Sequence, residues 1–254
     1  MRTLLFAILM ASLASAAASQ CKVVSGPGTA VLLELYTSEG CSSCPPADRW
    51  LSRFAGGRAD ARVVPIAFHV QYWDYIGWKD MFGDARFTQR QRLVAAAAGA
   101  RYVYTPQVIV AGRDAPDWSR EAQFMRAVEA ANSRNARATL AIEPRIAADG
   151  TISGAIDATL AEGVPAGPRV LTVVAMQSGL SSRVTAGENR GEFLKHDFVA
   201  RDVAEAPVPG RKAQLRFAFP PRPGWDARHM SVAAFLQDTN TGEVLQAIAA
   251  APCP

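Results

Sequence analysis

The sequence predicts an α/β domain followed by an all-β domain of sandwich character. Between residues 30 and 134, short β-type runs alternate with segments of helical character, which favours an α/β layer built partly from parallel strands. From residue 137 onward, β-type runs are separated by turns, a pattern typical of an all-β unit. Since 254 residues suffice for one large or two small domains, we expect domains at 22–136 and 137–254.

The first segment predicts three strands and three helices. Pro45 and Pro46 suit the first turn of a helix, because proline lacks only a backbone donor that is unused there, and Asp48 adds a favourable negative charge near that end. Thr88 is expected to cap the second helix. The expected strands are 30–37, 62–70 and 104–113, and the expected helices begin near 45, 88 and 119.

The second segment predicts a series of short strands. Asp149-Gly150 lies between two β-type runs, which is a strong hairpin signal. The expected strands after this hairpin are 169–177, 198–204, 213–220, 230–238 and 243–250.

The N-terminus has the layout of a signal peptide over residues 1–18. Arg2 supplies a positive charge, an apolar stretch follows, and small residues come next. We therefore expect an exported protein, periplasmic or secreted. A lipoprotein anchored through Cys21 is the weaker alternative, because Gln20 is a poor residue before a lipidated cysteine. No later stretch approaches the roughly 20 apolar residues of a membrane span.

Charge argues against a nucleic-acid partner. The formal net charge is only +4 and no long Lys/Arg run is present, so the charged residues are expected to form ordinary solvated surface.

The four cysteines predict two disulfides. Export places them where disulfides persist. Cys41 and Cys44 are natural partners by proximity, which leaves Cys21 and Cys253 for a structural bridge near the two ends of the exported chain.

Cys41 and Cys44 form a CxxC motif between an expected strand and an expected helix. A helix N-terminus stabilises a thiolate through its unpaired N–H groups and partial positive charge. We expect Cys41 to be exposed and to react with substrate, and Cys44 to resolve the mixed disulfide. This order of elements is that of the thioredoxin fold. In that fold a cis-proline lies beside the dithiol, and its backbone pairs with a substrate peptide. Pro106 is the candidate for this proline, and Thr105 before it is expected to bind substrate.

The chain also resembles a known family over nearly all of its expected exported part. The family is a bacterial group of exported thioredoxin-like proteins, a domain of unknown function of the 1223 type. This resemblance implies a thioredoxin-like fold and carries no established substrate or activity. The segments that carry it are "LELYTSEGCSSCPPAD", "AFHVQYWDYIGWKDMF", "VYTPQVIVAGR", "GENRGEFLKHDFV" and "VAAFLQDTNTGEVLQA".

Two further side chains are candidates for the chemistry. Glu34 lies in an apolar strand seven positions before Cys41; it is either a buried general base or a charge paired with an arginine. His69 ends a strand, where it could tune the thiolate, join Cys41 and Cys44 in a copper or zinc site, or form structural hydrogen bonds.

The aromatic segment 71–82 has two interpretations. Tyr72 and Trp73 could bind an extended peptide beside Cys41, or they could pack an insertion onto the core. The charged stretch 187–198 is expected to form a turn with paired charges.

These observations favour an exported thiol–disulfide oxidoreductase that acts on protein or peptide thiols and disulfides. One alternative is a copper-binding protein, because soft thiolates select Cu(I). Another is a non-catalytic binding module in which the CxxC disulfide is a permanent staple. The sequence contains no phosphate-binding glycine loop, GxSxG or HExxH motif, and we expect no cofactor.

Overall fold

The computed structural model describes residues 21–56 and 62–254. The expected signal peptide at 1–18 lies outside the described residues. Within them, no helix combines the length and the apolar character needed to cross a membrane.

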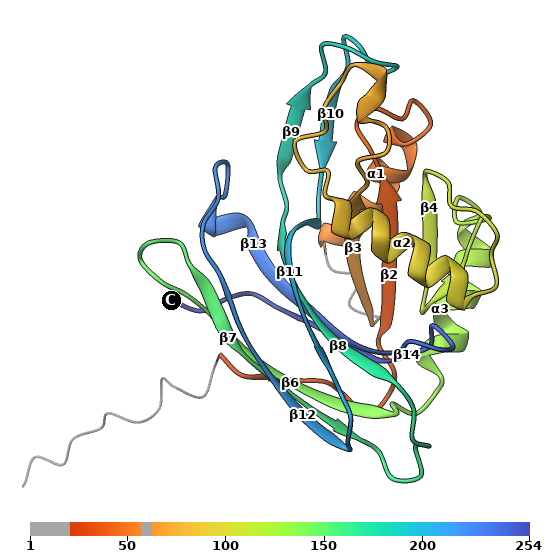
Figure 1. The fold of residues 1–254 in the computed structure, drawn as a ribbon, viewed down its shortest axis with the longest axis vertical. Helices are drawn as coiled ribbons and strands as arrows, with labels where there is room; N and C mark the ends of the chain where they lie inside the picture. Colours follow the sequence, from red (N-terminus) through yellow and green to blue (C-terminus); the bar gives the residue numbers. More distant parts are fainter. Residues whose placement is uncertain (1–20, 57–61) are drawn as a thin grey trace, which may run out of the picture.

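One eight-stranded sheet contains strands from both segments of the chain (Figure 1). Its order is β14-β13-β8-β11-β3-β2-β4-β5. The strands are β2 (Val31–Thr37), β3 (Val63–His69), β4 (Gln107–Val110), β5 (Arg113–Asp114), β8 (Arg169–Gln177), β11 (Val199–Pro207), β13 (Met230–Asp238) and β14 (Val244–Ala250).

Two smaller sheets complete the β-structure of the described residues. The first has the order β1-β6-β7-β12 and the second is the hairpin of β9 and β10. Their strands are β1 (Val23–Val24), β6 (Ala138–Ile146), β7 (Ile152–Leu160), β12 (Lys212–Phe219), β9 (Leu180–Arg183) and β10 (Phe193–His196).

The expected fold class is wrong. Among the residues described there are three α-helices, and strands predominate. An α/β thioredoxin-like domain followed by an all-β domain is therefore not what the structure shows, because β2, β3 and β4 share a sheet with β8, β11 and β13. Local sequence patterns report each strand but not its partner, and the pairing of β3 with β11 joins strands far apart in the sequence. The boundary between residues 136 and 137 stays a prediction.

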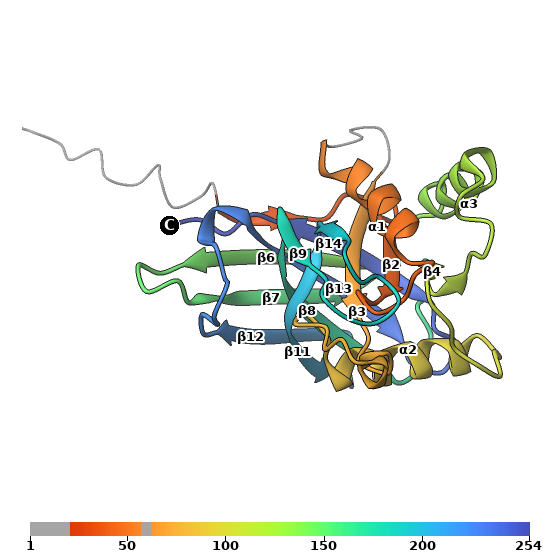
Figure 2. The same ribbon diagram turned by 90° about the horizontal axis from the view of Figure 1, so that it is seen from above.

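The helices lie on both faces of the large sheet (Figure 2). Helices α1 (Pro45–Ser52) and α3 (Glu121–Asn132) pack with one face of β2, β3 and β4, while α2 (Ala85–Ala97) packs on the opposite face. The sheet that contains β6, β7 and β12 packs against β8, β13 and β14. Helix α2 starts earlier than expected, because the Asp84 side chain, rather than Thr88, caps it by accepting a hydrogen bond from the Arg86 N–H. The part of the chain that the structure describes also contains three short 3-10 helices, at Arg53–Gly56, Asp74–Ile76 and Ala227–His229.

The junction of β3 and β11 determines where the β9–β10 hairpin lies. The two strands are parallel, and Val199, the first residue of β11, pairs with Ala67 near the end of β3. The preceding residue, Phe198, has a left-handed φ of 57° and accepts a hydrogen bond from the Ala67 N–H. His196, three residues before β11, lies against His69 at the end of β3, with the ring centroids 5.0 Å apart. The residues just before β11 therefore lie at the carboxyl ends of β2 and β3, where the CxxC loop begins. Figure 1 shows the hairpin beside α1 at that end of the sheet.

A disulfide links the two ends of the described chain. Cys21 and Cys253 are bonded, as the sequence predicts, with Cα atoms 5.8 Å apart and a sequence separation of 232 residues. Cys253 also exchanges backbone hydrogen bonds with Pro144 and Ile146 of β6. The bridge therefore attaches the C-terminal residues to the four-stranded sheet.

Replacing both of these cysteines, as Cys21→Ser/Cys253→Ser, should lower the free energy of unfolding by about 2–5 kcal/mol, because the bridge closes a very long loop in the unfolded chain. Urea denaturation of the wild type and the variant measures the difference. An unchanged midpoint with an unchanged slope would contradict this expectation.

Candidate functional site

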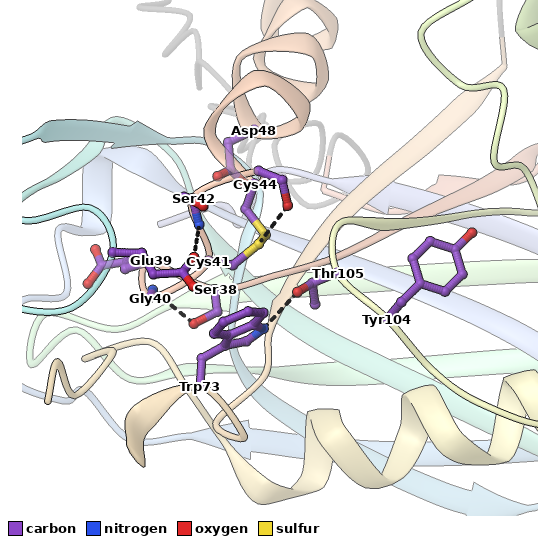
Figure 3. The surroundings of a disulfide bond; sticks show 12 residues. Ser38, Glu39, Gly40, Cys41, Ser42, Cys44, Asp48, Trp73, Tyr104 and Thr105 are labelled. Atoms are coloured by element: carbon purple, nitrogen blue, oxygen red, sulfur yellow. Dashed lines mark hydrogen bonds between the residues drawn. A yellow bond between two sulfur atoms is a disulfide. The ribbon is translucent and has the colours of Figure 1, made fainter. Parts of the chain in front are cut away.

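Cys41 and Cys44 form a disulfide between the end of β2 and the start of α1 (Figure 3). Their Cα atoms are 5.4 Å apart. Cys44 is the N-cap residue of α1 and Pro45 its first residue, as the proline pair predicts. The Ser43 hydroxyl lies 3.3 Å from the Cys41 sulfur, so a polar group and a helix N-terminus both lie at the disulfide.

The expected exposure of Cys41 is wrong for this closed form. Cys41 and Cys44 are both 0% exposed, whereas Ser42 and Ser43 between them are exposed. The neighbouring segments cover the ring, and Trp73 packs so closely that a Cβ on Gly40 would lie 3.0 Å from the Trp73 Cβ. A substrate thiol can therefore reach a sulfur only after local displacement of this cover.

Trp73 and Thr105 lie together beside the disulfide loop (Figure 3). The Trp73 Nε1–H donates a 2.7 Å hydrogen bond to the Thr105 hydroxyl. The Thr105–Pro106 peptide bond is cis, as predicted. Because Gln107 of β4 pairs with Tyr36 of β2, this peptide lies next to the start of the CxxC loop.

Tyr72 packs, half-buried, against the core cluster on the α2 side of the sheet. Burial raises the pKa of its hydroxyl, and the neighbouring Gln91 and Thr105 side chains oppose this shift. The three residues expected to bind substrate therefore lie near one another, with Thr105 beside both Trp73 and Tyr72. Trp73 contacts the same core cluster, so it packs on the core and also lies beside the CxxC loop.

Glu34 lies on the wrong face of the sheet to act as the proton acceptor. It is fully buried on the α2 face, whereas α1 packs on the opposite face with Leu33 and Leu35. The Glu34 carboxylate accepts hydrogen bonds from Arg90 Nε at 2.8 Å and from the Tyr36 hydroxyl at 2.9 Å. The arginine-paired alternative is therefore the one that the structure shows.

A buried cluster of ionisable groups lies where β3, α1 and β10 meet. We call it the His–carboxylate cluster; its members are Glu39, Asp48, His69, Asp80 and His196, all of them buried. His69 Nδ1 lies 2.7 Å from Asp80 Oδ2, and the two imidazole rings meet edge to face with centroids 5.0 Å apart. His196 Nε2 lies 3.3 Å from Glu39 Oε1, and His196 Nδ1 lies 3.9 Å from Asp48 Oδ2.

Burial and mutual attraction set the pKa values in the His–carboxylate cluster. Burial alone would lower the pKa of His69, but the adjacent Asp80 carboxylate raises it overall. Burial would raise the pKa of Asp80, yet His69 and the backbone N–H groups of Glu39 and Phe82 lower it overall. Burial raises the pKa of Asp48, although His196 and His69 oppose the shift. His69 and Asp80 therefore form a buried ion pair, and the pKa of Asp48 nearby is raised.

The structure does not assemble the expected metal ligands. The sulfurs of Cys41 and Cys44 are bonded to each other, and Nδ1 of His69 is engaged by Asp80. Across the described parts of the chain, no group of three or more His, Cys, Asp or Glu side chains has an arrangement suited to a metal ion.

The loop between β9 and β10 covers the CxxC loop from the side of the hairpin. Asn189, a buried residue, donates from its side-chain amide to the carbonyl oxygens of Glu39 and Cys41. The exposed Glu188 carboxylate accepts a 3.0 Å hydrogen bond from the Ser42 N–H, which lowers the pKa of Glu188. The turn expected over 187–198 is shorter than predicted: it spans 187–192, and residues 193–196 form β10. The charge of Glu188 meets the Ser42 N–H, so the turn also belongs to the site.

A polar groove of about 400 Å³ opens between α1 and this hairpin. Its lining includes Ser42, Pro45, Arg49, Glu188 and Lys195. The groove therefore borders the exposed middle of the CxxC motif and carries charges of both signs.

Sequence reasoning missed several residues of this site. Glu39, Asp80 and Asn189 have roles that depend on contacts between distant segments, and Asp48 was interpreted only as a helix-end charge. The sequence offers two weak signals for these residues: Glu39 lies directly before Gly40-Cys41, and Asp80 lies in the segment after the strand that ends in His69. Neither signal identifies the site without the fold.

The His69–Asp80 pair predicts a pH-dependent contribution to stability. The raised pKa of His69 means that its stabilisation is complete below the unfolded value, near 6.5, and is lost as the pH rises through the folded value. The lowered pKa of Asp80 means that its stabilisation is present above about 4 and is lost as the pH falls further. Asp80→Asn should therefore cost about 3–5 kcal/mol of unfolding free energy near pH 5.5, and less near pH 9.

Denaturant unfolding of both proteins at the two pH values measures this difference. Asp149→Asn, in the exposed turn between β6 and β7, is the matched control and should show the same small cost at both. An Asp80→Asn cost that is identical at pH 5.5 and pH 9 would show that His69 does not titrate against Asp80.

Comparisons with known proteins agree on the fold and on a family. A crystal structure of a protein from Agrobacterium tumefaciens is similar, with 23% sequence identity, coverage of 89% of this chain and 96% of that chain, and a TM-score of 0.59. HBP35 of Porphyromonas gingivalis is similar with 13% identity, coverage of 89% and 76%, and a TM-score of 0.64. At these identities the likeness concerns the fold alone. No curated protein matches the chain.

The model of one protein family matches residues 32–237, which include the CxxC loop, the aromatic segment, the cis-proline and the β9–β10 hairpin. The family is described as a protein of unknown function, DUF1223. The match covers most of the chain and agrees with the family resemblance of its sequence. The chain therefore belongs to the DUF1223 family.

Proposed function

We propose that the protein is a thiol–disulfide oxidoreductase whose redox couple is Cys41–Cys44. The observation that carries this proposal is the closed Cys41–Cys44 ring at the N-terminus of α1. A disulfide at this position yields thiolates that the helix N-terminus stabilises after reduction. The Ser43 hydroxyl, 3.3 Å from the Cys41 sulfur, is placed to donate to the Cys41 thiolate.

Exchange at this site proceeds through a mixed disulfide. A substrate thiolate attacks the Cys41 sulfur, the Cys41–Cys44 bond breaks, and Cys44 leaves as a thiolate. A second substrate thiolate then attacks the substrate sulfur of the mixed disulfide and releases the Cys41 thiolate. Two electrons pass from the substrate dithiol to the protein, and the substrate leaves as a disulfide. The reverse sequence reduces a substrate disulfide.

The groove beside the exposed Ser42 supplies a place for the substrate backbone. Its mixed charges and its position between α1 and the hairpin suit a protein or peptide rather than a small apolar molecule. Asp48 lines the same groove one helical turn after Cys44, and its raised pKa suits it to exchange protons with the dithiol. Disulfides persist in oxidising compartments, so two of them support an exported location, periplasmic or secreted.

The central test is exchange with a peptide that carries a disulfide or a dithiol. The wild type should exchange with the peptide, and Cys41→Ser should abolish the reaction because no attacking or attacked sulfur remains there. Cys44→Ser should stop turnover and accumulate the mixed disulfide on Cys41, which mass spectrometry detects.

The double variant Cys21→Ser/Cys253→Ser is the matched control, since it removes a disulfide of the same chain and leaves Cys41–Cys44 in place. It should retain exchange when assayed under conditions in which it is folded. Equal exchange by the wild type and Cys41→Ser would remove the oxidoreductase proposal.

A permanent staple in a binding module is the second candidate. The full burial of both sulfurs is the observation that favours it, because structural disulfides are shielded from attacking thiols. The same assay separates the two functions. A staple gives no exchange in the wild type and no mixed disulfide in Cys44→Ser.

A further inference from the structure

A side chain remote in sequence holds the backbone of the CxxC loop. The Asn189 amide nitrogen donates to the Glu39 carbonyl at 2.8 Å and to the Cys41 carbonyl at 3.0 Å, across sequence separations of 150 and 148 residues. Asn189 is only 5% exposed. Two hydrogen bonds in so protected a place constrain the peptide group before Gly40 and the peptide group after Cys41.

Asn189 itself is held rigidly by its own hairpin. Its carbonyl accepts a hydrogen bond from the Glu192 N–H at 3.0 Å. Gly187, two residues earlier, has a φ of +71° and packs so closely on Ile76 that a Cβ there would lie 3.2 Å from the Ile76 Cδ1. At the base of the hairpin, the buried His196 ring packs edge to face on His69, and its Nε2 lies 3.3 Å from the Glu39 carboxylate.

Other groups fix the remaining polar atoms of the loop. The Glu39 N–H donates to Asp80 at 2.9 Å, and its carboxylate accepts from Trp78 Nε1 at 2.8 Å. The Ser42 N–H donates to Glu188 at 3.0 Å. Asn189 is the group among these that binds the backbone of a redox cysteine directly.

We propose that Asn189 is a positioning residue of the Cys41–Cys44 couple, holding the Cys41 backbone in place while the ring opens and closes. The role in turnover rests on the proposed oxidoreductase function, whereas the effect on the disulfide equilibrium does not. The hairpin thus belongs to the redox centre.

The chemical consequence follows from what reduction changes. Two electrons and two protons convert the S–S bond into two thiols, after which the sulfurs are free to separate. While the Cys41 carbonyl stays hydrogen-bonded to Asn189, the Cys41 backbone is held in place. The two sulfurs can then separate only by rotation of the cysteine side chains. The two sulfurs remain at a high effective concentration, which favours ring closure and lowers the reduction potential.

The test is the redox equilibrium of Cys41–Cys44 with glutathione, followed by alkylation and mass spectrometry. Asn189→Ala should weaken disulfide formation about tenfold, which raises the reduction potential by about 30 mV for a two-electron couple. Asn189→Asp should weaken it further, because the new carboxylate faces two carbonyl oxygens. Thr185→Ala, an exposed polar residue of the same loop, is the matched control and should leave the equilibrium constant unchanged.

A second experiment distinguishes an effect on the Cys41–Cys44 couple from a general loss of stability. It introduces Asn189→Ala into the variant Cys41→Ser/Cys44→Ser, which lacks this disulfide. Positioning of the couple predicts a larger drop in unfolding midpoint in the disulfide-bonded protein than in this background. Equal drops, or an unchanged glutathione equilibrium in folded Asn189→Ala, would overturn the proposal.

Glu188→Ala keeps the proposal falsifiable if the Asn189 variants do not fold. This exposed residue binds the Ser42 N–H, and its loss should weaken disulfide formation by about threefold; no shift would then overturn the proposal. Absence of peptide exchange in the wild type would remove the oxidoreductase function and leave the equilibrium test intact.

Discussion

The junction of β3 with β11 is the constraint on which the rest of the structure depends. Val199 pairs with Ala67 near the end of β3, and His196, three residues earlier, lies against His69 with the ring centroids 5.0 Å apart, so the chain segment before β11 lies at the carboxyl ends of β2 and β3. That segment is the β9–β10 hairpin, and β2 leads directly into the CxxC loop at the same edge. The left-handed Phe198 lets the chain turn into β11 at this point, at a backbone cost of about 1–3 kcal/mol that the surrounding structure offsets.

This arrangement concentrates ionisable groups in a place with little water. Three carboxylates and two imidazoles come from three elements and two loops, and isolated charges at such burial would be very costly. The His69–Asp80 ion pair and the hydrogen bonds around Glu39 offset that cost. The His–carboxylate cluster therefore links the CxxC loop, α1, the aromatic segment and the hairpin. A displacement of one of these segments alters the contacts of the others.

Local features of the structure could be predicted from the sequence, and non-local ones could not. Short-range patterns predict the strands near 31–37 and 63–69, the turn at Asp149-Gly150, the helix start at Pro45 and the Cys41–Cys44 disulfide. The Cys21–Cys253 disulfide follows by elimination, because these are the two cysteines that remain. The two interpretations of Glu34 stayed open because β2 is buried on both faces, so the alternation that would assign a side is missing. Asn189 and His196 join the site only through β11, whose partner no periodicity reveals. Burial of the Cys41 and Cys44 sulfurs likewise could not be predicted, because the segments that cover them are distant in the sequence.

The reduction potential of the wild-type Cys41–Cys44 couple tests the central claim most directly. Structural disulfides have potentials below about −300 mV, whereas those of catalytic dithiols range from about −270 to −120 mV. Equilibration with glutathione mixtures, with Cys21–Cys253 monitored separately by mass spectrometry, gives the value for the CxxC couple alone. A potential within the catalytic range is what the account predicts. A value below about −300 mV would contradict it and would identify Cys41–Cys44 as a permanent structural bridge.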